Sequence, residues 1–260
     1  METEPLLVTA NDGVATIVIN RPARKNAITQ AMWVELASHI NRLSSGPDVR
    51  VIVLRGAGQD FSAGADISEF DTLRGDPTSA RAYEATNSAA FAALRNAAVP
   101  VIAAIRGICF GGGFGLAAAC DLRIATPEAQ FAVPAARLGL AYPQDAMGDI
   151  VWAAGPQMAR YLTYTAGRID AQAALSAGFL LEIADAERFD VRVGEVARTI
   201  AENAPLSVRA SKAAIRSALS HDPGEAALAQ ALGDATFLSD DYAEGRAAFA
   251  GRRTPAFKGQ

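Results

Sequence analysis

The spacing of hydrophobic and polar residues divides the chain into a β-rich start, an alternating middle and a helical end. Two β-rich runs, "LLVTA" and "VATIVIN", flank an Asn-Asp-Gly sequence at residues 11–13, which predicts a β-hairpin. Apolar residues then recur at helical spacing between residues 32 and 43, and Thr29 is placed to cap that helix. The start of the chain therefore predicts a hairpin followed by an amphipathic helix.

The middle of the chain repeats a buried strand, a turn of small residues and a helix. Residues 50–56, "RVIVLRG", and residues 100–107, "PVIAAIRG", are typical of buried strands, and a helix is expected between them from about residue 79 to residue 97. This repetition predicts an α/β core with a largely parallel sheet. From about residue 157 the β signal mostly fades, and the remaining amphipathic helices are expected to cap the core or to pack against other subunits.

The composition excludes some classes of partner. The chain has 260 residues, half of them hydrophobic, which is enough for one large core or one core with a small helical appendage. Its formal charge of −4 gives no excess of positive charge for binding phosphates, so we expect no nucleic-acid partner. Cys109 and Cys120 lie in apolar sequence, which indicates buried thiols in a reducing compartment. The two histidines form no ligand set with them, so no metal is expected.

Two segments bear on the cellular location. The N-terminal run "METEPLLVTAND" has no basic region followed by an apolar run, so no secretory signal is expected. Residues 99–120 resemble a membrane span, but Arg106 lies in their middle and "GGGFG" would weaken a continuous helix. We therefore expect a soluble, cytoplasmic protein with no membrane partner.

Two turns, each directly after a predicted buried strand, are candidates for chemistry. They are "DFSAGADISEF", residues 60–70, and "RGICFGGGFGLAAACDLRIA", residues 106–125. In each, small residues open a helix and leave backbone N–H groups free. Two such groups that converge make an oxyanion hole, which contributes about 3 kcal/mol per donor to a developing charge. The alternative is that these glycines only permit a helix to pack closely on a sheet.

The glycine-rich turn does not match the common nucleotide or hydrolase motifs. After Gly111 and Gly113, the dinucleotide pattern requires glycine at position 116, which is Leu116. No Gly-Lys-Ser/Thr follows, and the chain has no Gly-x-Ser-x-Gly sequence. A nucleotide-binding oxidoreductase is an alternative with the same fold class. That alternative predicts binding of NAD and no binding of coenzyme A.

An ordered set of motifs resembles the enoyl-CoA hydratase/isomerase (crotonase) superfamily over almost the whole chain. The motifs are "NRPARKNAIT", "FSAGADISEF", "PVIAAIRGICFGGGFGLAAACDLRIA", "LTYTAGRIDAQAALSAGFL" and "RRTPAFKG". The resemblance implies an α/β fold with a crotonase-like ββα-repeat spiral core at residues 1–200. It implies a C-terminal helical region at residues 201–260 that packs on the core or forms a homotrimer or homohexamer.

The resemblance also implies site residues. The N–H groups of Ala65 and Gly112 match the two donors to the thioester oxygen of an acyl-coenzyme A substrate, and no separate cofactor is implied. Two groups match coenzyme A-binding positions, the second of them reaching a neighbouring subunit: Arg24, Lys25, Ala63, Asp66 and Ile67, then Phe257 and Lys258. The alternative for the three cations is solvated surface charge.

The sequence departs from the family at the positions of the two glutamates that a typical hydratase uses. These positions are Gly115 and Ala135, so the substrate pocket lacks the general acid and base that add water to the double bond. The isomerases that keep only the second glutamate are not matched either.

Two residues after Ala135, Tyr142 and Asp145, are candidates for replacing the missing acids, and Arg137 is a candidate for contacting the substrate. Tyr142 matches a tyrosine in an acyl-CoA decarboxylase branch, or it only lines the acyl pocket. Asp145 lies two positions beyond the aspartate of other branches, and it also fits a helix N-cap. Arg137 could pair with a substrate carboxylate, or form a surface or intersubunit salt bridge.

Three functions fit these features. The first is an acyl-CoA enzyme that stabilises a thioester enolate, with decarboxylation of a malonyl-type thioester as the favoured reaction. The second is weak hydration of enoyl-CoA through Asp145 or Tyr142. The third is a non-catalytic acyl-CoA-binding protein. Retention of both glycine-containing turns favours an enzyme, because binding of the ground state alone has less need of those donors.

Overall fold

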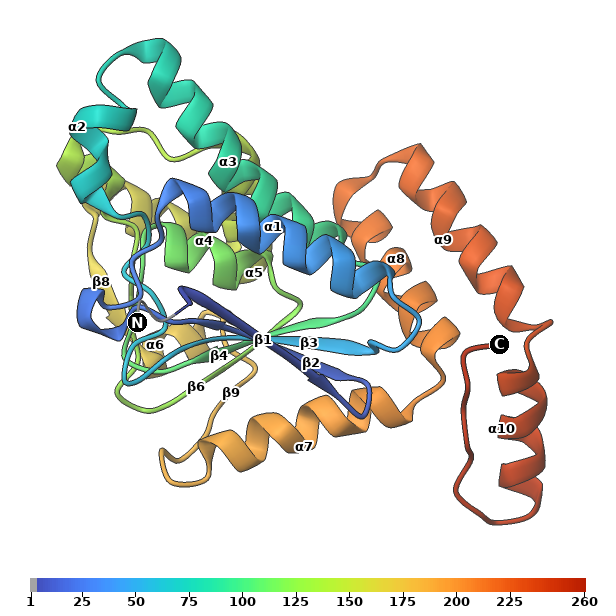
Figure 1. Cartoon of the computed structure of the whole chain (residues 1–260). Coiled ribbons are helices and arrows are strands. Elements are labelled where there is room, and N and C mark those ends of the chain that lie inside the picture. Colours follow the sequence, from blue (N-terminus) through green and yellow to red (C-terminus); the bar gives the residue numbers. More distant parts are fainter. Residues whose placement is uncertain (1–3) are drawn as a thin grey trace.

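The computed structural model describes residues 4–260 (Figure 1). Residues 1–3, which begin the segment in which no secretory signal is expected, lie outside the described residues. The large sheet has the strand order β1-β2-β3-β4-β6-β9, and a small sheet has the order β5-β7-β8. The strands are β1 (Leu6–Asn11), β2 (Val14–Ile19), β3 (Val51–Gly56), β4 (Val101–Ile105), β5 (Ile108–Phe110), β6 (Leu122–Ala125), β7 (Gln130–Ala132), β8 (Arg168–Asp170) and β9 (Glu182–Ile183).

The predicted hairpin and parallel sheet are both confirmed. β1 and β2 pair antiparallel with Val8 opposite Ile17, and the turn between them has Asp12 at φ 50° and Gly13 at φ 79°. Positive φ at both turn residues matches the right-handed twist of the flanking strands. From β2 onward, every pairing in the large sheet is parallel. The hairpin is therefore an antiparallel edge on an otherwise parallel sheet.

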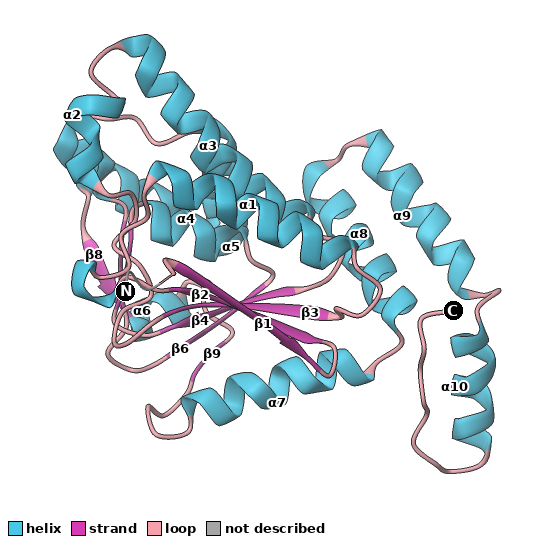
Figure 2. Cartoon of the chain, in the orientation of Figure 1, coloured by secondary structure: helices cyan, strands magenta, loops and turns pink. Residues whose placement is uncertain are grey.

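Helices cover both faces of the large sheet, as the secondary-structure view in Figure 2 shows. They are α1 (Gln30–Ser45), α2 (Phe70–Leu73), α3 (Pro77–Asn96), α4 (Gly112–Ala119), α5 (Gln144–Thr165), α6 (Ala171–Ser176), α7 (Phe189–Glu202), α8 (Pro205–Ser220), α9 (Pro223–Thr236) and α10 (Asp240–Ala250), with short 3-10 turns η1 (Pro22–Arg24), η2 (Ile67–Glu69) and η3 (Pro134–Leu138). The Thr29 cap is confirmed, because its hydroxyl accepts from the N–H of Met32 at 3.3 Å.

Alternating strand residues divide the core into two layers. Ile52 and Leu54 of β3 face the main core, which includes buried side chains of α1, α3, α4 and α5. Val51 and Val53 face the other side, where they pack with Phe189 and further residues of α7. Figure 1 shows the same division, with α7 alone beneath the sheet. Burial on both faces explains why these strands are continuous apolar runs in the sequence.

The end of the chain is mainly helical, as predicted, apart from the short strands β8 and β9. α8 is held to the core by Lys212, whose Nζ donates to the Val99 carbonyl at 3.0 Å and to the Asp121 carboxylate at 2.7 Å. α9 and α10 extend beyond α8 to one side of the sheet (Figure 1). Among residues 4–260, no helix combines the length and apolarity that crossing a membrane requires.

Candidate active site

The two glycine-containing turns meet at the start of α4. A Cβ on Gly64 would lie 2.7 Å from the backbone nitrogen of Gly112 and 2.7 Å from the carbonyl oxygen of Phe110. Gly64 also has a φ of 91°, which side chains rarely adopt. A Cβ on Gly112 would lie 3.5 Å from the backbone nitrogen of Ala65. The structure therefore brings together Ala65 and Gly112, the two residues that the sequence nominated as oxyanion donors.

Neither of these two N–H groups has a hydrogen-bond acceptor within residues 4–260. The groups on either side of Ala65 are occupied: the N–H of Gly64 donates to Ser62 Oγ at 3.0 Å, and that of Asp66 donates to the Ile28 carbonyl at 2.9 Å. The turns thus fix their own backbone and leave two adjacent donors free. Such a pair can hold an oxygen that gains negative charge.

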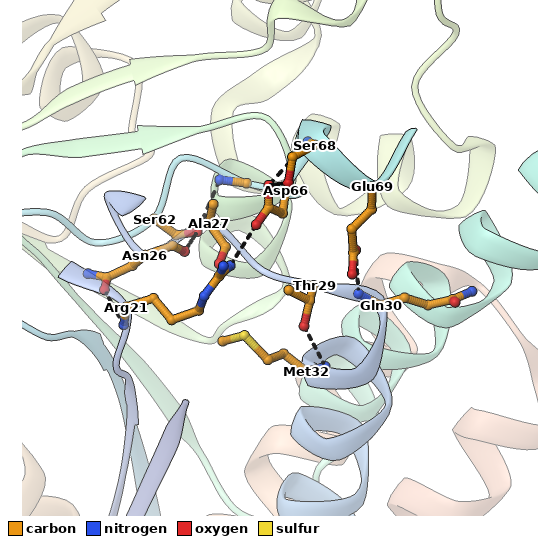
Figure 3. Close-up of polar contacts among 11 residues, drawn as sticks. Arg21, Asn26, Ala27, Thr29, Gln30, Met32, Ser62, Asp66, Ser68 and Glu69 are labelled. Carbon is orange, nitrogen blue, oxygen red and sulfur yellow. Dashed lines mark hydrogen bonds and ion pairs between the residues drawn. The ribbon is translucent and has the colours of Figure 1, made fainter. Parts of the chain in front are cut away.

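The buried side chains of Asn26 and Ser62 hold this geometry, as Figure 3 shows in part. Asn26 Nδ2 donates to the carbonyls of Ala57 and Asp60 at 2.9 and 2.6 Å. Ser62 Oγ donates to the Asn26 carbonyl at 2.8 Å and accepts from Gly64. Sequence reasoning missed both as positioning residues. The signal was their place beside the two motifs, Asn26 in "RKNAIT" and Ser62 in "FSAGAD".

The Asp66 carboxylate is used inside the chain. It accepts from Arg21 Nη1 at 2.8 Å, and from the hydroxyl and N–H of Ser68 at 2.7 and 3.2 Å (Figure 3). Burial raises the pKa of Asp66, but the hydrogen bonds from Ser68 and Arg21 outweigh it, so that the pKa lies below its usual value. The residue is therefore ionised at neutral pH and ties the N-terminal turn to η2.

The other predicted coenzyme A residues of this region lie on η1, on η2 and in the turn between β3 and η2. Arg24 and Lys25 are exposed at the end of η1, and the Lys25 carbonyl accepts from the N–H of Ala63 at 2.9 Å. Ile67 follows on η2, and 65% of its surface is exposed. Two exposed cations and an exposed apolar side chain thus belong to the segments that lead into the first glycine-containing turn and out of it.

The C-terminal tail is held by its own chain. The N–H groups of Lys258 and Gly259 donate to the Asp241 carboxylate at 2.7 and 2.8 Å, and Arg50 donates to the Phe257 carbonyl at 2.8 Å. Within residues 4–260, no hydrogen bond or ion pair joins this tail to Arg24 or its neighbours. The structure therefore does not bring Phe257 and Lys258 into the group formed by the other predicted coenzyme A residues.

The space beside Gly115 is filled by Tyr142. A Cβ at Gly115 would overlap the Tyr142 hydroxyl and would lie 2.8 Å from Cζ of Phe91. The hydroxyl donates to the Gly111 carbonyl at 2.9 Å. Burial raises the pKa of Tyr142 well above its usual value, so the phenol is neutral at physiological pH. As a neutral hydroxyl it donates a hydrogen bond.

The remaining candidates lie in η3 and in the first turn of α5. Ala135 is half-buried in η3, and Arg137 is exposed, without a hydrogen bond or ion pair to any residue of the described range. Asp145 is exposed and accepts from the Ser88 hydroxyl at 3.1 Å. Its interpretation as a helix N-cap is wrong: Pro143 holds that position, because α5 begins at Gln144 and Asp145 lies inside the first turn.

An aromatic side chain next to the turns was not foreseen. A Cβ on Gly112 would lie 2.9 Å from Cζ2 of Trp33, so the indole ring of α1 packs against the start of α4. Trp33 also meets Phe91 edge-on, with ring centroids 5.6 Å apart. The helical pattern had assigned this segment to the core alone. A tryptophan in this helical segment was the signal that could have identified Trp33.

The cysteines do not supply a nucleophile. Cys109 and Cys120 are free and buried, and burial raises the pKa of Cys120 to about 12, so its thiol stays protonated. In the range 4–260, no three His, Cys, Asp or Glu side chains are grouped so that they could hold a metal ion. The chemistry available here comes from the free N–H groups and from Tyr142.

The chain is similar along its length to proteins of one family. The profile of the family described as enoyl-CoA hydratase/isomerase matches residues 9–260. The chain is 33% identical over 258 residues to a probable enoyl-CoA hydratase of Mycobacterium leprae and 31% identical over 261 residues to a crotonyl-CoA hydratase of Syntrophomonas wolfei, each covering 99% of both chains. An enoyl-CoA hydratase/carnithine racemase from Magnetospirillum magneticum has the same fold, with a TM-score of 0.93 and 34% identity over 100% of this chain and 97% of the other. The chain therefore belongs to the enoyl-CoA hydratase/isomerase (crotonase) family.

Proposed function

We propose that the chain is an acyl-CoA enzyme that binds the thioester oxygen between the N–H groups of Ala65 and Gly112. The observation that carries this proposal is the meeting of two adjacent N–H groups for which the described chain offers no acceptor. When an enolate forms, its charge gathers on that oxygen, and each donor stabilises it by about 3 kcal/mol. The coenzyme A thioester is the substrate, and the proposed steps use no further cofactor.

The proposed reaction is decarboxylation of a malonyl-type thioester. The bond between the α-carbon and the carboxylate breaks, its electron pair enters the enolate, and carbon dioxide leaves. The α-carbon then takes a proton from the Tyr142 hydroxyl or from water, and solvent restores a proton lost by Tyr142. This step needs enolate stabilisation and no general base, which suits a site with glycine at position 115 and alanine at position 135. The exposed Arg137 stays a candidate partner of the carboxylate.

Hydration is the second candidate, and the names of the relatives favour it. Both the Mycobacterium leprae and the Syntrophomonas wolfei proteins are named as hydratases. Hydration needs a base to activate water and an acid to protonate the α-carbon. Tyr142 is a neutral phenol and Asp145 lies exposed on the first turn of α5, so we expect hydration to be slow. A non-catalytic acyl-CoA binder is the third candidate.

The test is a parallel assay of malonyl-CoA, methylmalonyl-CoA and crotonyl-CoA. We expect decarboxylation at about 1–10 per second and crotonyl-CoA hydration at least about a hundredfold slower. Faster hydration than decarboxylation would contradict the proposed reaction. Tight binding of all three thioesters without turnover would identify a binding protein, and binding of NAD without coenzyme A would exclude an acyl-CoA protein.

Tyr142→Phe tests the role of the hydroxyl, with Tyr164→Phe as its matched control on the exposed part of α5. If Tyr142 delivers the proton, Tyr142→Phe lowers the rate of protonation of the α-carbon by about a hundredfold. Tyr164 is 76% exposed, so its variant should keep the parent rate. Equal rates in both variants would assign proton delivery to water.

We also propose that the chain forms a homotrimer or homohexamer through its C-terminal helices. The apolar side chains of Ile215, Phe237, Leu238 and Phe249 are 63–91% exposed on or beside α8, α9 and α10. In such an assembly, Phe257 and Lys258 are proposed to reach the coenzyme A of a neighbouring subunit. Light scattering after gel filtration measures the mass, and a monomer at micromolar concentration would contradict this assembly.

A further inference from the structure

The first turn of α4, which carries the proposed thioester donor Gly112, is enclosed on one side and open on another. A Cβ added to Gly113 would lie 2.6 Å from the carbonyl oxygen of Ser62, so backbone closes that side. Apart from its chain neighbours and the start of α4, the described atoms nearest to a Cβ added to Gly111 lie at 3.9 Å, one of them Cδ of Pro134 in η3. A thioester at Gly112 therefore has more room towards η3 than towards Ser62.

Aromatic side chains close the side of α4 that Gly112 and Gly115 share. Residues three apart are neighbours on a helix, with about 5–6 Å between their Cβ positions. A Cβ on Gly112 would lie 2.9 Å from Cζ2 of Trp33, and the Trp33 ring meets the Phe91 ring with centroids 5.6 Å apart. A Cβ on Gly115 would lie 2.8 Å from Cζ of Phe91 and would overlap the Tyr142 hydroxyl. Trp33, Phe91 and Tyr142 thus form a continuous barrier, here called the aromatic wall.

Contacts between α3 and α5 hold the aromatic wall in place. On α3, Ser88 and Arg95 lie on either side of the phenylalanine of the wall, and Asp145 and Asp149 follow Tyr142 along the chain. The Ser88 hydroxyl donates to Asp145 at 3.1 Å, and Arg95 Nη1 pairs with the Asp149 carboxylate at 2.5 Å. Asp149 is only 3% exposed, and separating a buried carboxylate from its cation is costly. The phenylalanine and the tyrosine are therefore fixed relative to each other.

The position of the wall limits the length of the acyl group. The sulfur and the acyl chain leave the thioester carbonyl carbon in different directions. When the long coenzyme A arm takes the open side towards η3, the acyl chain points towards the wall. One helical turn, about 5–6 Å, separates the position of Gly112 from that of Gly115, where the tyrosine and phenylalanine rings begin. An extended butyryl chain is shorter than this distance, and an extended hexanoyl chain is longer.

We propose that the aromatic wall of Trp33, Phe91 and Tyr142 restricts the enzyme to short acyl groups, no longer than butyryl. This inference rests on the proposed function, because it concerns the acyl group of the thioester held at Ala65 and Gly112. Malonyl and methylmalonyl groups lie within the limit. Medium-chain and long-chain acyl groups are excluded, because they would have to displace rings that are packed against α4.

A series of saturated thioesters tests the limit without any turnover. Acetyl-, butyryl-, hexanoyl- and octanoyl-CoA are titrated into the parent protein, and their dissociation constants are compared. In an open apolar pocket, each added methylene would tighten binding about fourfold. We expect octanoyl-CoA instead to bind at least about fivefold more weakly than butyryl-CoA, because the longer chain meets a packed wall. Equal or tighter binding of octanoyl-CoA overturns the proposal.

Phe91→Leu and Tyr142→Leu each shorten the wall. We expect either variant to improve the binding of octanoyl-CoA relative to butyryl-CoA by at least about fourfold, the effect of accommodating one more methylene. Tyr142 is only half-buried, so its variant tests the wall even if Phe91→Leu does not fold. An unchanged ratio in the folded variants overturns the proposal. Failure of every thioester, acetyl-CoA included, to bind the parent protein overturns the proposed function instead.

Phe189→Leu is the matched control for Phe91→Leu. Phe189 is equally buried, but it packs with Val51 and Val53 in the layer between the sheet and α7. Both variants lose the same atoms from a core, and thermal unfolding compares the resulting losses of stability. We expect Phe189→Leu to keep the parent ratio of octanoyl-CoA to butyryl-CoA binding. An equal gain for octanoyl-CoA in this control would mean that general loosening admits longer chains, and it would overturn the assignment to the wall.

Discussion

The turns that carry Ala65 and Gly112 are built from backbone, whereas the region around Gly115 is built from aromatic side chains. In the turns, glycines allow two chain segments to approach, and hydrogen bonds from Asn26 and Ser62 fix them. Around Gly115, the Tyr142 hydroxyl and the Phe91 ring fill the space directly. The first region depends on the absence of side chains and the second on their identity. A substitution beside Gly115 can therefore alter the site without disturbing the two turns.

The strongest way to break the backbone region is Gly64→Ala. The added Cβ would contact Gly112 and Phe110 backbone atoms at 2.7 Å, in a residue with a φ of 91°. We expect a loss of about 1–3 kcal/mol of unfolding free energy and at least about a hundredfold loss of kcat/KM. Thermal unfolding and steady-state kinetics measure these two effects.

Gly148→Ala is the control for Gly64→Ala. It lies in α5, where a Cβ would meet nothing within 4 Å. We expect normal turnover and a gain of up to about 1 kcal/mol of stability. If both variants kept full activity, the close approach of the two turns would not matter for the reaction.

A double-mutant cycle sharpens the contrast at Gly115. Gly115→Ala should cost about 1–3 kcal/mol, because its Cβ overlaps the Tyr142 hydroxyl and crowds Phe91. In a Tyr142→Phe background the overlap with the hydroxyl is gone, and we expect the cost to fall by about 1 kcal/mol. Chemical denaturation of the four proteins measures the coupling. Strict additivity would show that the two residues do not share this space.

The ion pair between Arg21 and Asp66 makes a smaller contribution that depends on pH. The folded pKa of Asp66 lies below its unfolded value of 3.8, so its stabilisation is present above that pH and is lost as the pH falls through the folded pKa. We expect Asp66→Asn to lose about 1 kcal/mol near neutral pH and to become less sensitive to acid. A loss of the same size at pH 7 and below pH 3 would mean that ionisation plays no part.

The charges of Arg24 and Lys25 should have the smallest effect, because both are exposed. The double variant Arg24→Gln/Lys25→Gln should raise KM for a coenzyme A thioester about three- to tenfold at low salt, with kcat unchanged. Its effect should shrink as salt is added. The same thioester on a short pantetheine without the nucleotide serves as the control, and it should show no change in KM.

Much of the fold could be predicted because the signals are local. The Asn-Asp-Gly turn, the apolar runs of β3 and β4 and the Thr29 cap each depend on a few adjacent residues, and the structure bears them out. The Asp145 cap failed because α5 begins two residues earlier than that cap requires, which moves the capping position to Pro143. Helix boundaries depend on such small differences, which the sequence pattern does not resolve.

The order of residues alone predicts the α/β core and the two glycine-containing turns, and it shows that positions 115 and 135 carry no carboxylate. Only the tertiary structure placed the Tyr142 hydroxyl in the space beside Gly115, and only it packed Trp33 of α1 against Gly112. The physical reason is the range of the interactions. Turns and strands follow from neighbouring residues, whereas the filling of a site follows from how helices far apart in the chain pack on one sheet.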